Sequence, residues 1–195
     1  MKSPLGLLSL LFAVFLTSLP SFAEEGFVEL FNGKDLTGWD GNPELWSVED
    51  GAITGKTKGP EHLTYNQFII WRGGTLKNFE LRVKMKVEGD SNSGMQYRSK
   101  ELPENGKWSI GGYQCDVHPA AENNGMLYHE RGRGIVAKNG QTVVVDPSAQ
   151  KWLTADRTPI SVNIAEWNEY TVIAKGNHLV HKINGQVSAE IHDFD

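Results

Sequence analysis

Short runs of alternating apolar and polar residues, separated by turn signals, constrain the fold of this chain more than any other feature. In the clearest run, residues 79–87, Leu, Val and Met alternate with Glu, Arg and Lys. Successive side chains of a strand point to opposite faces of its sheet, so this run predicts a half-exposed strand. Asp50-Gly51 and Asn184-Gly185 are typical hairpin turns. With no long window of helical periodicity, the pattern predicts an all-β protein, a two-sheet antiparallel sandwich or barrel.

The other predicted strands are equally short and are separated by turn signals. They are residues 27–31, 46–48, 52–54, 68–71, 126–130, 142–145, 170–174, 178–183 and 187–192. Residues 147–165 lack such a pattern, which predicts a long loop. Without an internal repeat or a linker, residues 24–195 are expected to form one domain.

Residues 1–23 have the features of a secretory signal peptide. Lys2 precedes an apolar run from Leu5 to Leu19, and Ser21 and Ala23 supply the small residues of a cleavage site. A membrane anchor is the alternative, but the run is shorter than the about 20 residues that a spanning helix needs, and Pro20 ends it. We therefore expect cleavage after Ala23, a secreted or periplasmic protein, and no integral membrane segment thereafter.

Composition excludes some partners and some forms of stabilisation. The net charge is −5, without blocks of one sign, so no basic face for nucleic acid is expected. The single cysteine, Cys115, cannot form an internal disulfide. Stability must therefore come from the burial of apolar side chains. A bound divalent metal could add to it.

Two runs, residues 92–99 and 112–118, concentrate chemically reactive side chains. If both lie in one sheet, alternation puts Met95, Tyr97, Tyr113, Cys115 and Val117 on a packed face. The opposite face then carries an arginine, two amides, a carboxylate and an imidazole, rather than the Thr, Lys and Glu of an ordinary solvated strand. These residues are Gln96, Arg98, Gln114, Asp116 and His118. The mixture indicates a polar functional site.

Structural roles are the alternatives for the same residues. Arg98 and Asp116 are also suited to a structural ion pair across neighbouring strands, and His118 to anchoring a loop before Pro119. A divalent metal is a weaker alternative, because imidazole and carboxylate ligands occur close together in the sequence without a tight ligand motif. Those ligands would be Asp116, His118, Glu122 and His129.

Six stretches in order resemble the 3-keto-disaccharide hydrolase family, long known as a domain of unknown function numbered 1080. They are FNGKDLTGW (31–39), WSVEDGAITG (46–55), NFELRVKMKV (78–87), NSGMQYRS (92–99), GYQCDVH (112–118) and WNEYTVIAKGNHLVHKINGQ (167–186). The resemblance implies a concanavalin-like or laminin-G-like jelly roll, secretion by bacteria that degrade glycans, and cleavage of glycosides oxidised to a ketone at C3. It also implies a Gly-rich strand and a final strand beyond the Asn184-Gly185 hairpin, whereas this chain stops at Asp195, so either the sequence is truncated or the last strands are absent. Loss of a final strand would leave an unpaired sheet edge.

The expected reaction follows from the 3-ketone. Jelly-roll glucanases carry Glu-x-Asp-x-x-Glu on one strand, whereas Gln114, Asp116 and Pro119 stand in that register here, so the usual two-carboxylate mechanism is not predicted. A 3-ketone acidifies the C2 proton, and a base can then form an enolate that expels the group at C1 before water adds. The cleavage is thus expected by this elimination and hydration, or by direct hydrolysis.

Each candidate residue has a hypothetical role in this reaction. Either Asp116 or His118 takes the C2 proton, and Arg98 stabilises the developing negative charge. Tyr128 or Glu130 protonates the leaving group. Substrate contacts are expected from Asn92, Gln96, Gln114, Trp108 and Arg131. A non-catalytic carbohydrate-binding module of the same fold is the alternative, because fold does not dictate function.

Overall fold

The computed structural model describes residues 26–57, 63–89 and 91–195. The predicted signal peptide, residues 1–23, lies outside the described residues. The chain divides into two compact units, Met1–Leu30 and Phe31–Asp195, and every strand below belongs to the second. No helix in the described part of the chain is long and apolar enough to cross a membrane.

The larger sheet has six strands in the order β11-β10-β14-β13-β12-β5. Their bounds are β5 Phe79–Met85, β10 Gln141–Val145, β11 Lys151–Asp156, β12 Asn168–Lys175, β13 His178–Ile183 and β14 Gln186–Asp193. Neighbours are antiparallel except β10 and β14, which run parallel.

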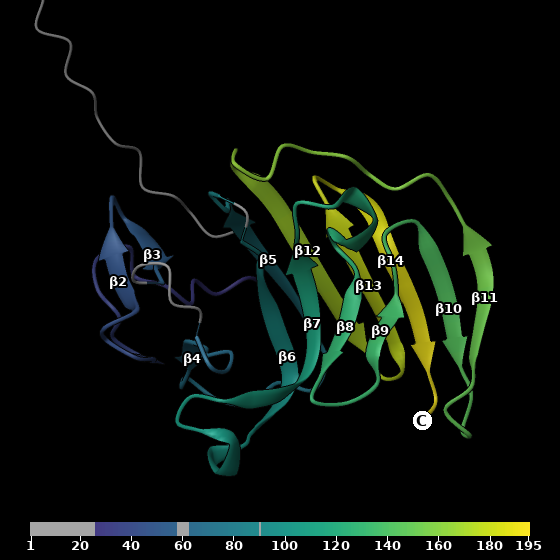
Figure 1. The fold of residues 1–195 in the computed structure, drawn as a ribbon, viewed down its shortest axis with the longest axis horizontal. Coiled ribbons are helices and arrows are strands. Elements are labelled where there is room, and N and C mark those ends of the chain that lie inside the picture. The colour runs from purple at the N-terminus through teal and green to yellow at the C-terminus, as the bar shows by residue number, and fades with distance from the viewer. Residues whose placement is uncertain (1–25, 58–62, 90) are drawn as a thin grey trace, which may run out of the picture. The chain divides into compact units, whose positions relative to one another are not determined.

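The smaller sheet has four antiparallel strands in the order β6-β7-β8-β9. Their bounds are β6 Ser93–Glu101, β7 Ile110–Val117, β8 Leu127–Glu130 and β9 Gly134–Ala137. Figure 1 shows the two sheets as stacked layers, which confirms the predicted sandwich.

Two short strand pairs and two single-turn helices complete the described elements. They are β1 Trp39–Asp40 with β4 Ile70–Trp71, β2 Trp46–Glu49 with β3 Ala52–Gly55, and the 3-10 helices η1 Pro103–Asn105 and η2 Ala121–Asn123.

Apolar side chains from the facing surfaces of the two sheets form the core. The smaller sheet contributes Met95, Tyr97, Cys115 and Val117, as the alternation predicted, together with Leu127, and all five are at most 7% exposed. The larger sheet contributes Tyr170, Val172, Leu179, Ile183 and Ile191. Fully burying one such aliphatic side chain contributes about 1.5–3 kcal/mol, so this layer supplies most of the driving force for folding.

One buried polar group is accommodated in this core. His181 is fully buried, its Nε2 lies 2.8 Å from the Tyr97 hydroxyl, and its Nδ1 lies 3.3 Å from the Gly125 carbonyl oxygen. Burial lowers the pKa of His181 to about 4 despite these backbone contacts, so the imidazole is neutral. Nδ1–H therefore donates to the carbonyl, and Nε2 accepts from Tyr97.

Three expectations about the chain's course need correction. Residues 27–31 do not form a strand. The predicted loop 147–165 contains β11, an edge strand that the pattern missed because nearly all its side chains are exposed, so they show no alternation. The last strand, β14, pairs on both sides with β13 and β10, so no unpaired sheet edge arises at this strand.

A half-buried ion pair joins the two sheets. Arg133, between β8 and β9, contacts both carboxylate oxygens of Asp193 at the end of β14, with Nη1 3.1 Å from Oδ1. The Tyr113 hydroxyl donates to Asp193 Oδ2 at 2.8 Å. Burial would raise the pKa of Asp193, but the hydrogen bonds from Arg133 and Tyr113 outweigh it and lower the pKa below the usual value.

Replacing Arg133 by Met should lower the free energy of unfolding by about 3 kcal/mol, because the Asp193 carboxylate would stay buried without its charged partner. Chemical denaturation at neutral pH measures this. The matched control is Lys56→Met, which removes an exposed ion pair with Glu49 and should change stability little. A small and equal effect of both substitutions would contradict the structural role of Arg133.

Candidate functional site

The face of the smaller sheet that points away from the core gathers polar side chains from three strands. In the middle row, Gln96 of β6 pairs with Gln114 of β7, which pairs with Tyr128 of β8. At one end of this row Gly94 pairs with Asp116, and at the other Gly112 pairs with Glu130. The register therefore puts Gln96, Gln114 and Asp116 on one face, as alternation predicted.

Asp116 is the most perturbed acid of this face. Its side chain lies almost entirely out of water, with the residue only 3% exposed. Burial raises the pKa of Asp116, the hydrogen bond from Gln114 Nε2 to Asp116 Oδ1 lowers it, and the negative charge of Glu130 adds a smaller rise. The resulting pKa of Asp116 is about 7. A carboxyl group with this pKa exchanges its proton near neutral pH, which suits a general base or acid.

The two amide side chains near Asp116, Gln114 and Gln96, differ in their hydrogen-bond partners. Gln114 is buried and donates to Asp116; it occupies the space over Gly94, where a Cβ would lie 2.9 Å from its Nε2. Gln96 Nε2 is buried and has no hydrogen-bond partner, while its Oε1 lies 3.5 Å from the Ser99 hydroxyl. An unpaired buried donor is costly, so Gln96 Nε2 is a hydrogen-bond donor on this side of the sheet that the described residues leave unsatisfied.

Glu130 places a second carboxyl group on the same face. It is 9% exposed, and its oxygens lie 3.5 Å from Asn66 Nδ2 and 3.6 Å from Arg131 Nε. Its pairing partner Gly112 lies four residues from Asp116 on β7, about 13 Å along the strand. The half-buried Tyr128 lies in the row between the two acids.

His118 follows the end of β7 and is held by the η2 turn. Its Nδ1 accepts a hydrogen bond from the Ala120 backbone N–H at 2.9 Å, and its own N–H donates to Asn124 Oδ1 at 3.3 Å. With Nδ1 occupied as an acceptor, the neutral ring carries its proton on Nε2 and can offer that N–H as a donor. This geometry fits the loop-anchoring alternative and disfavours His118 as the base.

Arg98 does not join the polar face. Arg98 and Ser99 of β6 together oppose the single Gly112 of β7, which makes a β-bulge, and Arg98 has a left-handed φ of 49°. Its Nη2 donates to the Lys77 carbonyl oxygen at 3.2 Å. The expectation that Arg98 pairs with Asp116 or stabilises charge beside it is therefore wrong, because the bulge redirects the side chain.

The remaining substrate-contact candidates are spread over the surface. Trp108 is half-buried; its Nε1 donates to Asp40 at 2.8 Å, and the Lys107 ammonium lies 4.1 Å from its ring centroid. Lys107 thus already lies over that ring, which limits its use for stacking on a sugar. Arg131 is exposed and ion-paired to Glu130, and Asn92 is exposed in front of β6.

The proposed ligands of a metal at this site are not brought together. His129 of β8 lies on the core side of the sheet, where its ring packs 5.0 Å from that of Tyr113, whereas Asp116 faces the other way. Among the described residues, the group of three ligands close enough to hold an ion lies elsewhere.

The sequence pattern gave no indication of Asn66. Its contact with Glu130 joins residues 64 positions apart, and no periodicity or turn signal marks it. The unpaired state of Gln96 Nε2 was likewise invisible, because it depends on what surrounds the amide in three dimensions.

Comparison with known proteins identifies the family. The model of the 3-keto-alpha-glucoside-1,2-lyase-like domain matches residues 26–195. The chain belongs to this family. The resemblance indicated by the six sequence stretches is thereby confirmed.

Two relatives of this 3-keto-alpha-glucoside-1,2-lyase-like domain are informative. A 3-keto-disaccharide hydrolase of Bacteroides thetaiotaomicron is 33% identical over 89 residues, which are 40% of this chain and 29% of that protein. The chain thus matches less than a third of that curated relative's length. A crystal structure of a "putative glycosyl hydrolase" from Parabacteroides distasonis has a TM-score of 0.55 at 22% identity, covering 85% of this chain and 71% of that one, and supports the fold.

Two hollows in the surface of the family domain are lined by residues other than these acids. One of about 420 Å³ is bordered by Thr75, Leu76, Lys77, Arg98, Gly176 and Asn177. Another of about 260 Å³ is bordered by residues of β9, β10 and β11. The candidate site is thus assigned from its buried acids and amides and not from cavity size.

Asp116→Asn should raise the stability of this domain above pH 7 and leave it unchanged near pH 4. A carboxyl group with pKa about 7 when folded and about 4 when unfolded favours the folded state fully below pH 4, and this contribution is lost as pH rises through 7. The neutral amide avoids that loss, so urea denaturation at pH 8 should show a gain of about 2–4 kcal/mol. The exposed Asp156→Asn is the matched control. A gain that is equal at both pH values would refute the raised pKa.

Proposed function

We propose that this chain is an exported carbohydrate-active enzyme that cleaves the glycosidic bond of 3-keto-glycosides or 3-keto-disaccharides. Membership of the 3-keto-alpha-glucoside-1,2-lyase-like family and the curated relative's name support the substrate class. The features of residues 1–23 support export. The single observation that carries the proposal is the Asp116 carboxyl group, whose pKa burial raises to about 7 on a polar sheet face.

Asp116 acts as the base in this proposal. The C2 proton of a 3-keto sugar is acidified by the adjacent ketone, and a carboxylate of ordinary pKa near 4 is a weak base for it. Raising the pKa to about 7 strengthens the base while leaving a large fraction ionised at neutral pH. Gln114 Nε2, which donates to Asp116, fixes the carboxyl group in one orientation.

Stabilisation of the enolate falls to neutral donors rather than to Arg98. The unpaired Gln96 Nε2 lies in the row next to Asp116, where it can donate to the ketone oxygen as negative charge develops. A preorganised buried donor needs no reorganisation at that moment, which is where such groups lower a barrier most. In this proposal Gln96 thus stabilises the developing negative charge, a role that the sequence suggested for Arg98.

Tyr128 and Glu130 remain the candidates for protonating the leaving oxygen. Both lie on the face of Asp116, from the neighbouring strand β8. Glu130 also supplies a second carboxyl group on this face, but its pairing partner Gly112 lies about 13 Å along β7 from Asp116. The two acids of ordinary glycosidases lie about 5–9.5 Å apart, so direct hydrolysis with two acids is the less favoured route. The two routes differ in the fate of the hydrogen on C2. Elimination removes this hydrogen and hydration puts a hydrogen from water in its place, whereas direct hydrolysis leaves the original hydrogen on C2.

The test is to incubate the protein with 3-keto-trehalose or an aryl 3-keto-glucoside and to measure release of 3-keto-glucose. Asp116→Asn should lower kcat by about 10²–10⁴-fold with the fold intact, and the matched Asp156→Asn should not. In D₂O, product carrying deuterium at C2 beyond the enzyme-free background indicates elimination and hydration.

Saturable binding of the same substrate without release would instead indicate the non-catalytic module. Full activity of Asp116→Asn would remove Asp116 from the mechanism.

A further inference from the structure

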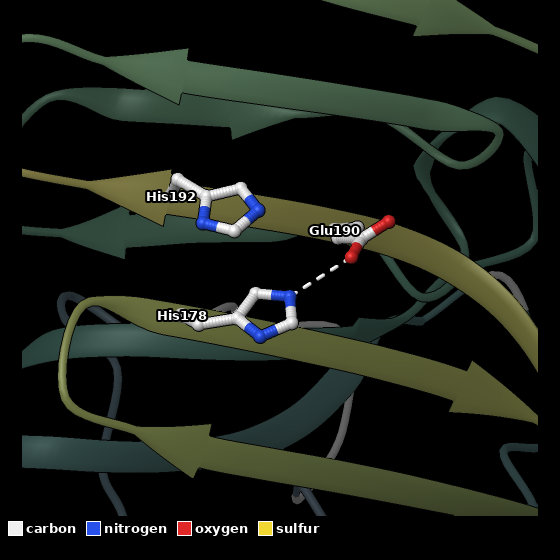
Figure 2. A group of neighbouring side chains, drawn as sticks. All are labelled: His178, Glu190 and His192. Carbon is white, nitrogen blue, oxygen red and sulfur yellow. Dashed lines mark hydrogen bonds and ion pairs between the residues drawn. The ribbon is translucent and has the colours of Figure 1, made fainter.

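A cluster of two histidines and one glutamate lies on the face of the larger sheet that points away from the core. His178 of β13 pairs directly with His192 of β14, and Glu190 lies two residues before His192. Because alternate residues of a strand share a face, all three side chains rise from the same side of the sheet, as Figure 2 shows. This is the other sheet from the one that carries Asp116.

The three side chains lie close to one another on this face. The imidazole rings of His178 and His192 are stacked with centroids 4.4 Å apart and an interplanar angle of 3°. His178 Nε2 lies 2.8 Å from Glu190 Oε1, as the dashed line in Figure 2 marks. One ligand atom from each residue lies within 4.8 Å of the others.

We propose that His178, Glu190 and His192 bind a divalent transition metal ion such as Zn²⁺. Two imidazoles and one carboxylate are a ligand set that suits zinc. Zn–N and Zn–O distances of about 2.0–2.2 Å place tetrahedral ligand atoms about 3.4 Å apart, and an imidazole nitrogen binds an ion in the plane of its ring. The two stacked rings must therefore rotate about their side-chain torsions until both ring nitrogens point at the ion. The ion replaces the proton in the hydrogen bond between His178 and Glu190. The negative charge of the Glu190 carboxylate offsets part of the positive charge of the ion.

The surroundings allow an ion to enter and a water to complete the coordination. The side chains of His178 and Glu190 are 42% and 32% exposed. Two positive groups lie near the cluster: Lys175 of β12 is the cross-strand neighbour of His178, and Arg157 donates to Thr142, the cross-strand neighbour of Glu190. Both side chains are exposed and can turn toward water. Val144 of β10 borders His192 on the other side.

Bound metal would clamp β13 to β14, the hairpin that ends the described fold. Its free energy of binding to the folded state adds to stability, because the unfolded chain does not hold the three ligands together. The two sheets and the core separate it from Asp116, so the ion is not part of the proposed sugar chemistry.

The experiment is a titration of the tag-free, metal-depleted full chain with ZnCl₂ by calorimetry, together with thermal unfolding. One ion should bind per chain, and Tm should rise with metal concentration. His178→Ala and His192→Ala should each weaken binding by more than about tenfold and abolish the rise in Tm. His118→Ala, which removes a half-buried imidazole of the other sheet, should retain both.

The readouts separate this proposal from the sugar chemistry. Loss of binding in His118→Ala, retention in His192→Ala, or the lack of saturable binding would each overturn the site. Circular dichroism verifies that the variants remain folded, and Co²⁺ substitution gives an absorption spectrum that reports the same ligands. The cleavage rate of the metal-depleted wild type should equal that of the loaded protein, so failure of the metal site leaves the proposed function untouched.

Discussion

The burial of the Asp116 carboxyl group is the constraint on which the functional account depends. A carboxylate that leaves water needs a cation or several hydrogen bonds to stay ionised, but Asp116 receives a hydrogen bond from the neutral Gln114 amide and repulsion from Glu130. Its pKa therefore rises to about 7. Arg133 and Asp193 show the opposite arrangement, in which a guanidinium keeps a buried acid ionised and joins the sheets. The same fold thus holds one acid that stabilises it and another that we propose for proton transfer.

Strand parity distributes these roles over the faces of the sandwich. The inward side chains of β6, β7 and β8 fill the core, and their outward neighbours form the row of amides and acids. In the larger sheet, the inward His181 is buried and neutral, whereas the outward His178 and His192 remain accessible on the opposite face. Three histidines on two adjacent strands therefore have distinct environments, because alternation sends them to different faces.

Local alternation was sufficient to predict the strands of the site and the face of Asp116, Gln96 and Gln114. It failed at Arg98, because one extra residue in β6 resets the parity beyond Tyr97. It could not reveal β11, whose side chains are exposed, nor the pairing of His178 with His192, which depends on the register between strands. Burial of Glu130 and its contact with Asn66 arise from long-range packing. Sequence pattern fixes faces, whereas bulges, register and loop packing decide which side chains meet.

The most direct test of the account is the titration of Asp116 itself. In protein labelled with ¹³C at aspartate carboxyl carbons, NMR assigns the Asp116 signal as the one missing from Asp116→Asn. The account predicts that this signal titrates with a pKa near 7, well above the usual range of an aspartate. A pKa near 4 for Asp116 would show that the carboxyl group is hydrated or charge-paired, and the proposed base would be withdrawn.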